Sequence, residues 1–320
     1  MATAEQVKTL IKSHFDSDPE RFSTIALQIA AHEARQGHGD VANEIRIIID
    51  NVKNKPVRIT FHRELEDLVL ELQPYHRLNE LVVSDSLKNR IQRILREYQQ
   101  QHKLKKHGID HRRKLLLAGP PGTGKTMTAS IIAKQLSLPF YTILMDKLVT
   151  KYMGETSAKL RQIFDLIERQ QGVYLFDEFD AIGAELGLEN DVGEMRRVLN
   201  AFLQFIEHDK SDSLIVAATN NLTLLDQALF RRFDDVLHYE LPTLKEATLL
   251  IDNRLGTFKR EFSSEKIAKK AIKLSQGEIA QACDDAIKET ILSDKQKVTG
   301  DIILAMLKDR TDAYGNRMTR

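Results

Sequence analysis

The sequence predicts an α/β fold in which a mostly parallel five-stranded sheet is flanked by helices and followed by an all-helical unit. Short β-rich runs alternate with helical patterns through the middle of the chain, which is typical of a parallel sheet with crossover helices. The five β-rich runs are Lys114–Ala118, Pro139–Leu144, Gly172–Phe176, Ser213–Ala218 and Val236–Glu240. After Leu241-Pro242 the strand signal ends, and helical spacing continues to about Asp309.

The chain divides into segments of different character. Residues 1–55 carry three short helical patterns and bury little surface alone, so they form either a partner- or substrate-binding domain or a packing element of the main domain. Residues 56–80 read as a linker, in which Leu65, Leu68, Val69 and Leu72 have the spacing of a short helix. The remaining predicted segments are the α/β unit 81–241, the helical unit 242–310 and a tail, 311–320.

Composition limits the function classes. The 320 residues are 42% hydrophobic and 29% charged, with a net charge of +1, so no global field would attract nucleic acid or an anionic membrane. The single cysteine, Cys283, excludes an intramolecular disulfide framework and fits a reducing compartment. No signal-peptide core and no membrane-length apolar run is present. We therefore expect a cytoplasmic protein without a membrane or nucleic-acid partner.

A glycine-rich loop follows the first strand and precedes a helical pattern. The loop, GPPGTGKT, has the G-x-x-x-x-G-K-T spacing of a phosphate-binding loop, although an ordinary glycine-rich turn is the alternative. Gly122 and Gly124 let the backbone bend sharply and approach a phosphate. Lys125 would reach the β- and γ-phosphates of a nucleoside triphosphate, and Thr126 would bind Mg²⁺. The residues expected to contact the nucleotide here are Pro121, Gly122, Thr123, Gly124, Lys125, Thr126 and Met127.

Polar side chains follow two further strands. Asp177 and Glu178 come directly after the third strand, at the sheet edge where ligands of α/β folds bind. Asp177 would hold Mg²⁺ or its water shell, and Glu178 would polarise the water that attacks the γ-phosphate. Asn220 at the tip of the fourth strand would orient that water or simply form a turn. Arg231 and Arg232 are either a solvated pair or fingers for a phosphate in another subunit's site.

These motifs together identify a family resemblance. GPPGTGKT, FDEFD, AATN and LDQALFRRFDD resemble the AAA group of the AAA+ ATPases, over about Leu81 to Leu307. The resemblance implies a P-loop NTPase domain with a helical lid, ATP and Mg²⁺ at a subunit interface, and a homo-oligomeric ring that is usually hexameric. Matched residue by residue, Lys125 and Thr126 fall in the Walker A motif, Asp177 and Glu178 in Walker B, Asn220 at sensor 1, and Arg231 and Arg232 at the finger positions.

The sequence departs from common patterns of the family at the finger arginines and in the lid. The compact Arg231-Arg232-Phe233 is closer to katanin-like and spastin-like members than to those with Arg-Pro-Gly-Arg-Phe, which leaves open which arginine reaches across. In the lid, Gly277 stands at a helix start that touches the nucleotide in the family, and no obvious arginine serves as sensor 2.

A further segment bears on what the ATPase acts on. LVTKYMGETSAKLRQIF, from Leu148 to Phe164, resembles the first pore loop of substrate-threading rings. Lys151, Tyr152 and Met153 would contact a passing polypeptide, because an aromatic offers large contact at low entropic cost. The alternative is that Tyr152 and Met153 merely cover the following helix. Gly187 to Arg197 would lie near a second pore loop.

The leading functional hypothesis is an ATP-hydrolysing ring motor that remodels or unfolds a protein by threading it past Tyr152. The alternative is an ATP-dependent switch that gates a separate effector enzyme, a protease or nuclease, without threading. A nucleic-acid motor is disfavoured by the near-zero net charge and by the aromatic in the pore-loop segment.

Overall fold

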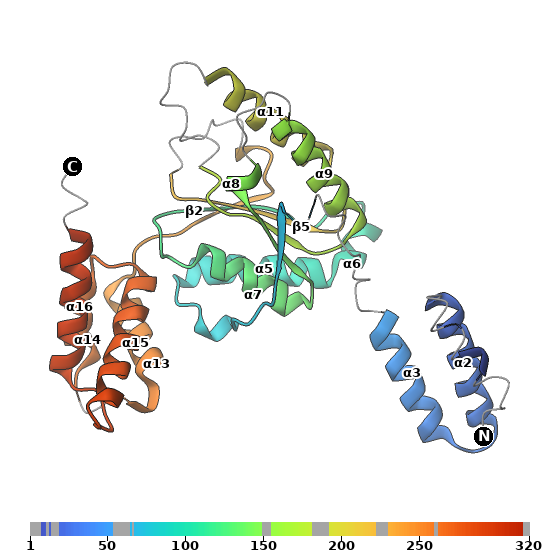
Figure 1. Cartoon of the computed structure of the whole chain (residues 1–320), viewed down its shortest axis with the longest axis horizontal. Coiled ribbons are helices and arrows are strands. Elements are labelled where there is room, and N and C mark those ends of the chain that lie inside the picture. The colour runs from blue at the N-terminus through green and yellow to red at the C-terminus, as the bar shows by residue number, and fades with distance from the viewer. Residues whose placement is uncertain are drawn as a thin grey trace. The chain divides into compact units, whose positions relative to one another are not determined.

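The computed structural model describes residues 8–10, 13, 19–53, 65, 67–148, 155–180, 192–221, 230–258 and 262–315. The chain forms two compact units, residues 1–59 and 60–320 (Figure 1). Among the residues described, no helix has both the length and the apolar character that crossing a membrane requires.

The first unit contains a pair of packed helices, α2 (Pro19–Arg35) and α3 (Gly39–Lys53). Pro19 opens α2, where its fixed φ and missing N–H suit the first helical turn, and Gly37 (φ +88°) permits the turn between the helices. His38 Nδ1 lies 2.8 Å from the Glu33 carboxylate and closes this turn. The first of the three predicted helices falls mostly outside the described residues.

The second unit is built on a six-stranded sheet in the order β1-β3-β4-β5-β2-β6. Its central strands pair in parallel, so the carboxyl ends of β2, β4 and β5 meet at one edge of the sheet. The five predicted strands are all present, within a residue or two of their predicted bounds. The strands are β1 (Val69–Leu72), β2 (Lys114–Ala118), β3 (Phe140–Ile143), β4 (Val173–Phe176), β5 (Leu214–Thr219) and β6 (Asp235–His238).

The sequence prediction was wrong about β1. The predicted sheet had five strands, and Leu65 to Leu72 was expected to be a short helix, but Val69–Leu72 is a sixth strand, antiparallel to β3. Leu68 and Val69 are buried, whereas Leu70 and Leu72 are exposed on this edge strand. Pairing with β3 satisfies the backbone of a run that is too short for its apolar spacing to distinguish helix from strand.

Helices cover both faces of the sheet (Figure 1). On one face α5 (Asp85–Gln99) and α7 (Lys125–Leu136) pack an aliphatic core, and on the other α9 (Glu155–Arg169) and α11 (Val192–His208) pack an aromatic one, beside the short α8 (Met145–Leu148). Ser84 caps α5, because its side chain accepts a hydrogen bond from the Leu87 N–H.

Three basic residues between α5 and β2, one of them in the short α6 (Gln101–Lys106), form ion pairs within the chain. Lys105 binds Asp212 at 2.6 Å, Arg112 pairs with Glu97, and Arg113 pairs with Asp209. These contacts give the three side chains a structural role.

The end of the chain is helical, as predicted, and forms its own core. It comprises α13 (Leu244–Leu255), the 3₁₀ turn η4 (Gly256–Phe258), α14 (Ser264–Ala271), α15 (Gln276–Leu292) and α16 (Gly300–Gly315). Thr243 and Glu246 form a capping box at the start of α13. Helix α16 continues to Gly315, past the predicted start of the tail. Cys283 lies in this core, where burial raises its pKa to about 12, so it behaves as a small apolar residue.

Candidate functional site

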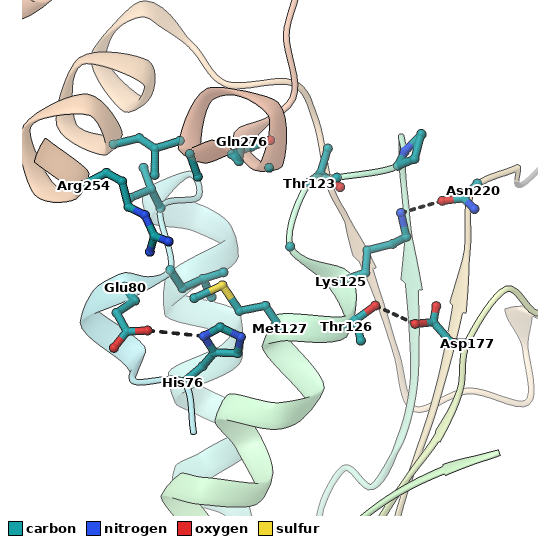
Figure 2. Close-up of a pocket in the computed structure, with 18 of the residues that line it drawn as sticks. His76, Glu80, Thr123, Lys125, Thr126, Met127, Asp177, Asn220, Arg254 and Gln276 are labelled. Carbon is teal, nitrogen blue, oxygen red and sulfur yellow. Dashed lines mark hydrogen bonds and ion pairs between the residues drawn. The ribbon is translucent and has the colours of Figure 1, made fainter. Parts of the chain in front are cut away.

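The candidate site is a cavity of about 540 Å³ between the β2–α7 loop, the ends of β4 and β5, and the lid helices α13 and α15. A volume of this size suits a drug- or nucleotide-sized ligand. Figure 2 shows two ends: a polar end with Lys125, Thr126, Asp177 and Asn220, and a far end with His76, Glu80 and Arg254. Every loop residue expected to contact the nucleotide lines this cavity, as do Asp177, Glu178, Asn220 and Gly277.

The loop between β2 and α7 has the backbone that its glycines predict. Gly122 (φ +74°) and Gly124 (φ +98°) are both left-handed, a conformation that glycine adopts without strain. The N–H of Gly277, at the start of α15, donates to the Gly122 carbonyl at 2.8 Å, which docks the lid onto the loop. Since α7 starts at Lys125, the loop and the positive end of that helix face the cavity together.

Lys125 is held at the polar end of the cavity. Its side chain is almost fully buried, and Nζ donates to the carbonyls of Gly119 and Pro120 at 2.8 Å and to Asn220 Oδ1 at 2.9 Å. Burial lowers the pKa of Lys125, while the carboxylates of Asp177 and Asp180 oppose that shift. The amino group therefore lies between the loop and the end of β5, surrounded by acceptors.

The acidic pair lies beside this lysine. Thr126 Oγ1 donates to Asp177 Oδ2 at 2.6 Å, and the Glu178 N–H donates to Asp177 Oδ1 at 2.9 Å. Glu178 is exposed in the cavity wall. Asp180 accepts a hydrogen bond from the Asn220 N–H at 3.1 Å, so the ends of β4 and β5 are joined.

The oxygens of Thr126 and Asp177 suit a magnesium ion that keeps most of its shell for waters and phosphate oxygens. Within the described ranges, no cluster of three or more His, Cys, Asp or Glu side chains is arranged to hold a metal. Thr126 and Asp177 would hold the ion together with a bound ligand that brings its own oxygens.

The far end of the cavity was not predicted from the sequence. His76 Nδ1 lies 3.3 Å from the Glu80 carboxylate, and Arg254 donates from Nε and Nη2 to the two Asp284 oxygens at 2.6 Å each. These side chains come from the linker, α13 and α15, which no local motif connects. The one local signal is the four-residue spacing of Leu250 and Arg254, which places both on one face of α13.

Other predicted site residues lie elsewhere. Lys151, Tyr152 and Met153 lie outside the described residues, between α8 and α9. Arg231 and Arg232 precede β6 and do not line the cavity. Arg231 is exposed and has no ion pair with a described residue, whereas Arg232 Nε donates to Glu207 of α11 at 3.0 Å.

Four features together define a P-loop nucleoside triphosphatase. They are a buried central strand, a glycine-rich loop, a Lys-Thr pair at a helix start, and an acidic pair that follows another parallel strand of the same sheet. The comparisons with known proteins narrow that class. Residues 115–241 match the family described as "ATPase family associated with various cellular activities (AAA)".

Relatives agree with this match. An uncharacterized AAA family ATPase, y4kL, from Sinorhizobium fredii is 30% identical over 306 residues, 93% of this chain and 92% of that protein. A proteasome-activating nucleotidase from Saccharolobus solfataricus is 31% identical over 211 residues, 63% of this chain and 54% of its own. The ATP-dependent zinc metalloprotease FtsH from Parabacteroides distasonis is 34% identical over 181 residues, 53% of this chain and 26% of its own. The chain belongs to the AAA family and is an ATP-hydrolysing enzyme.

Proposed function

We propose that this protein is the subunit of a homo-oligomeric ring, usually hexameric in this family, that uses ATP and Mg²⁺ to remodel or unfold a protein substrate. One observation supports the ring: at the polar end of the cavity, the described residues supply Lys125 but no arginine. Among the described residues that line the cavity, Arg254 is the only arginine, and it lies at the far end (Figure 2). There it donates to the Asp284 carboxylate. We infer that a second positive charge at the γ-phosphate, beside that of Lys125, comes from a neighbouring subunit.

In this proposal the polar end of the cavity performs hydrolysis. Lys125 and the loop N–H groups bind the phosphates, and Thr126 and Asp177 hold Mg²⁺, which neutralises phosphate charge when bound. Glu178 polarises the attacking water, which Asn220 orients. The far end, with buried Leu81 and Val82 beside charged groups, receives the nucleoside.

Arg231 is the better candidate for the finger that reaches the neighbouring site. It is exposed and charged, whereas Arg232 is engaged by Glu207 within its own subunit. We assign Arg231 to the γ-phosphate of the neighbouring site and Arg232 to holding the turn in place through α11.

The substrate is proposed to be a protein, threaded past Tyr152. One support is the resemblance of Lys151–Met153 to a pore loop. Another is that one relative is named a proteasome-activating nucleotidase and another an ATP-dependent metalloprotease. Residues 1–55 would select the substrate or a delivery partner. A cytoplasmic location fits a chain whose single cysteine is a buried thiol.

Tyr152→Ala tests threading against the switch alternative. A fluorescent protein with an unstructured tail serves as the probe, and Tyr152→Phe, which keeps the aromatic ring, is the matched control. Threading predicts that Tyr152→Ala retains basal ATPase but loses ATP-dependent unfolding of the probe, while Tyr152→Phe retains both. Full unfolding activity in Tyr152→Ala would instead favour a switch that gates a separate enzyme.

A further inference from the structure

One phenylalanine contacts both flanks of the acidic pair. Phe202 of α11 is completely buried. Its ring centroid lies 5.1 Å from that of Phe176 in an edge-on contact and 4.6 Å from that of Phe179. Phe176 directly precedes Asp177, and Phe179 directly follows Glu178. A single side chain of α11 therefore contacts the residue on each side of the pair.

The backbone around Glu178 is held on both sides as well. Phe176 ends β4, and the N–H of the fully buried Phe179 donates to the Ala218 carbonyl of β5 at 2.8 Å. Between these two anchors Glu178 has φ +51°, a left-handed conformation that is unfavourable for a non-glycine residue. Such a conformation persists only where the surroundings over-determine it. The packing of Phe176 and Phe179 therefore sets the direction in which the Glu178 carboxylate points.

The same aromatic cluster reaches α9. Phe164 of α9 packs on Phe202 at 5.8 Å and on Phe176 at 6.1 Å between ring centroids. Helix α9 begins at Glu155, directly after the segment that carries Tyr152, and α11 begins at Val192, inside the segment expected near a second pore loop. Figure 1 shows both helices on one face of the sheet. Two helices that start at the expected substrate-facing segments thus converge on the flanks of the acidic pair.

We propose that Phe202 and Phe179 are positioning residues for ATP hydrolysis. They hold Glu178 in its catalytic direction, and they pass movements of α9 and α11 to it. Neither ring lines the nucleotide cavity, so their effect on the reaction is indirect and runs through the acidic pair that they flank. Because protein interiors are close-packed, a shift of α11 moves Phe202 and with it both flanks of the pair. The transmission of movement, unlike the positioning, rests on the proposed threading function.

The experiment compares Phe202→Leu with Phe205→Leu in the full-length chain. Phe205 is a half-buried residue on the same helix that stacks on Phe164 at 5.2 Å, and no ring contact joins it to Phe176 or Phe179 within the described structure. Basal ATPase is measured against ATP concentration, nucleotide affinity by direct binding, and folding by thermal melting. Because a misplacement of about 1 Å at the reacting group slows chemistry on the order of 10²-fold, we expect Phe202→Leu to lower kcat by at least tenfold. Its KM and nucleotide affinity should stay within about twofold, and Phe205→Leu should keep kcat within about twofold.

A double-mutant cycle with Glu178→Gln separates positioning from loss of stability. If Phe202 acts through Glu178, adding Phe202→Leu to Glu178→Gln leaves the residual rate unchanged, because the positioned group is already gone. Equal losses of kcat in Phe202→Leu and Phe205→Leu, or a full further loss on top of Glu178→Gln, would overturn the proposal. Phe202→Met, which keeps more of the volume, takes the place of the leucine variant if that one does not fold.

If the proposed threading function is wrong but the positioning role is right, the same variants give a different pattern of ATPase rates. If the protein threads nothing, the tailed probe leaves wild-type ATPase unchanged while the basal kcat difference between the two leucine variants persists. If it threads and the cluster transmits movement, the probe stimulates wild type and Phe205→Leu more than Phe202→Leu.

Discussion

Gly122→Ala perturbs the contact between the phosphate loop and the lid. Gly122 has φ +74°, and a Cβ there would lie 2.4 Å from Ser275 Oγ. The left-handed conformation costs an alanine about 1–2 kcal/mol. Ser275 Oγ accepts the Glu278 N–H and caps α15, so displacing it costs about 1 kcal/mol more. The lid can relieve this strain by moving away from the loop. Because the nucleotide binds between the docked lid and the loop, part of its binding free energy must then be used to bring the lid back. We therefore expect nucleotide binding to weaken by up to about 2–3 kcal/mol, on the order of 30- to 150-fold.

Direct titration with a fluorescent ATP analogue measures this effect. Gly108→Ala is the matched control, because Gly108 has a similar φ of +69° with no atom within 4 Å of the added Cβ, so it should lower the melting temperature without changing nucleotide affinity. Adding Ser275→Gly to Gly122→Ala removes the clash at a cost of a few tenths of a kcal/mol in capping and should restore part of the affinity. Wild-type affinity in Gly122→Ala, or an equal loss in Gly108→Ala, would refute the reasoning.

The remaining predictions concern catalysis, the finger and pH. Glu178→Gln should bind ATP normally but lower kcat on the order of 10²–10³-fold, and unchanged turnover would contradict its role as base. Arg231→Ala should lower the ATPase rate of the assembled ring on the order of 10³-fold. Arg232→Ala and Glu207→Gln should each lower that rate less than about tenfold. Equal losses of rate for the two arginine variants would contradict the assignment. Burial lowers the pKa of His111 below its ordinary value of 6.5. Its imidazole packs edge-on against Tyr98, and neither ring nitrogen has a hydrogen-bond partner in the described structure. The charged groups that act on it include Asp212, Lys105 and Arg113. Since the unfolded chain takes up this proton more readily, the stability from neutral His111 is fully present above pH 6.5 and declines as the pH falls below that value. Thermal melts from pH 8 to 5 should show this loss, and His111→Phe should reduce it.

The polar half of the site could be predicted because its chemistry is local in sequence. The loop, the strand that precedes it and the helix that follows it are contiguous, so the spacing of Gly119 to Thr126 places the lysine and the threonine at a helix start. Asp177 and Asn220 end parallel strands, and the sheet brings such ends together without further information.

The rest depends on contacts between distant segments. The far end of the cavity combines His76 and Glu80 of the linker with Arg254 of α13, and nothing near any of them in the sequence indicates the others. Val69–Leu72 reads as part of a helix because Leu65, Leu68, Val69 and Leu72 have helical spacing, and only the pairing with β3 makes this run a strand. The engagement of Arg232 by Glu207 likewise required the packing of α11 to be known.

Subunit mixing tests most directly the claim that each site is shared between neighbours. Lys125→Ala removes the phosphate-binding side of a subunit's own site, and Arg231→Ala removes what it supplies to the next. Each variant alone should have almost no ATPase activity. In a closed ring with head-to-tail interfaces, an equal random mixture leaves roughly a quarter of the sites with both intact groups, so we expect about a quarter of wild-type activity. A mixture as inactive as its two components, under conditions where mixed rings form, would contradict the shared site.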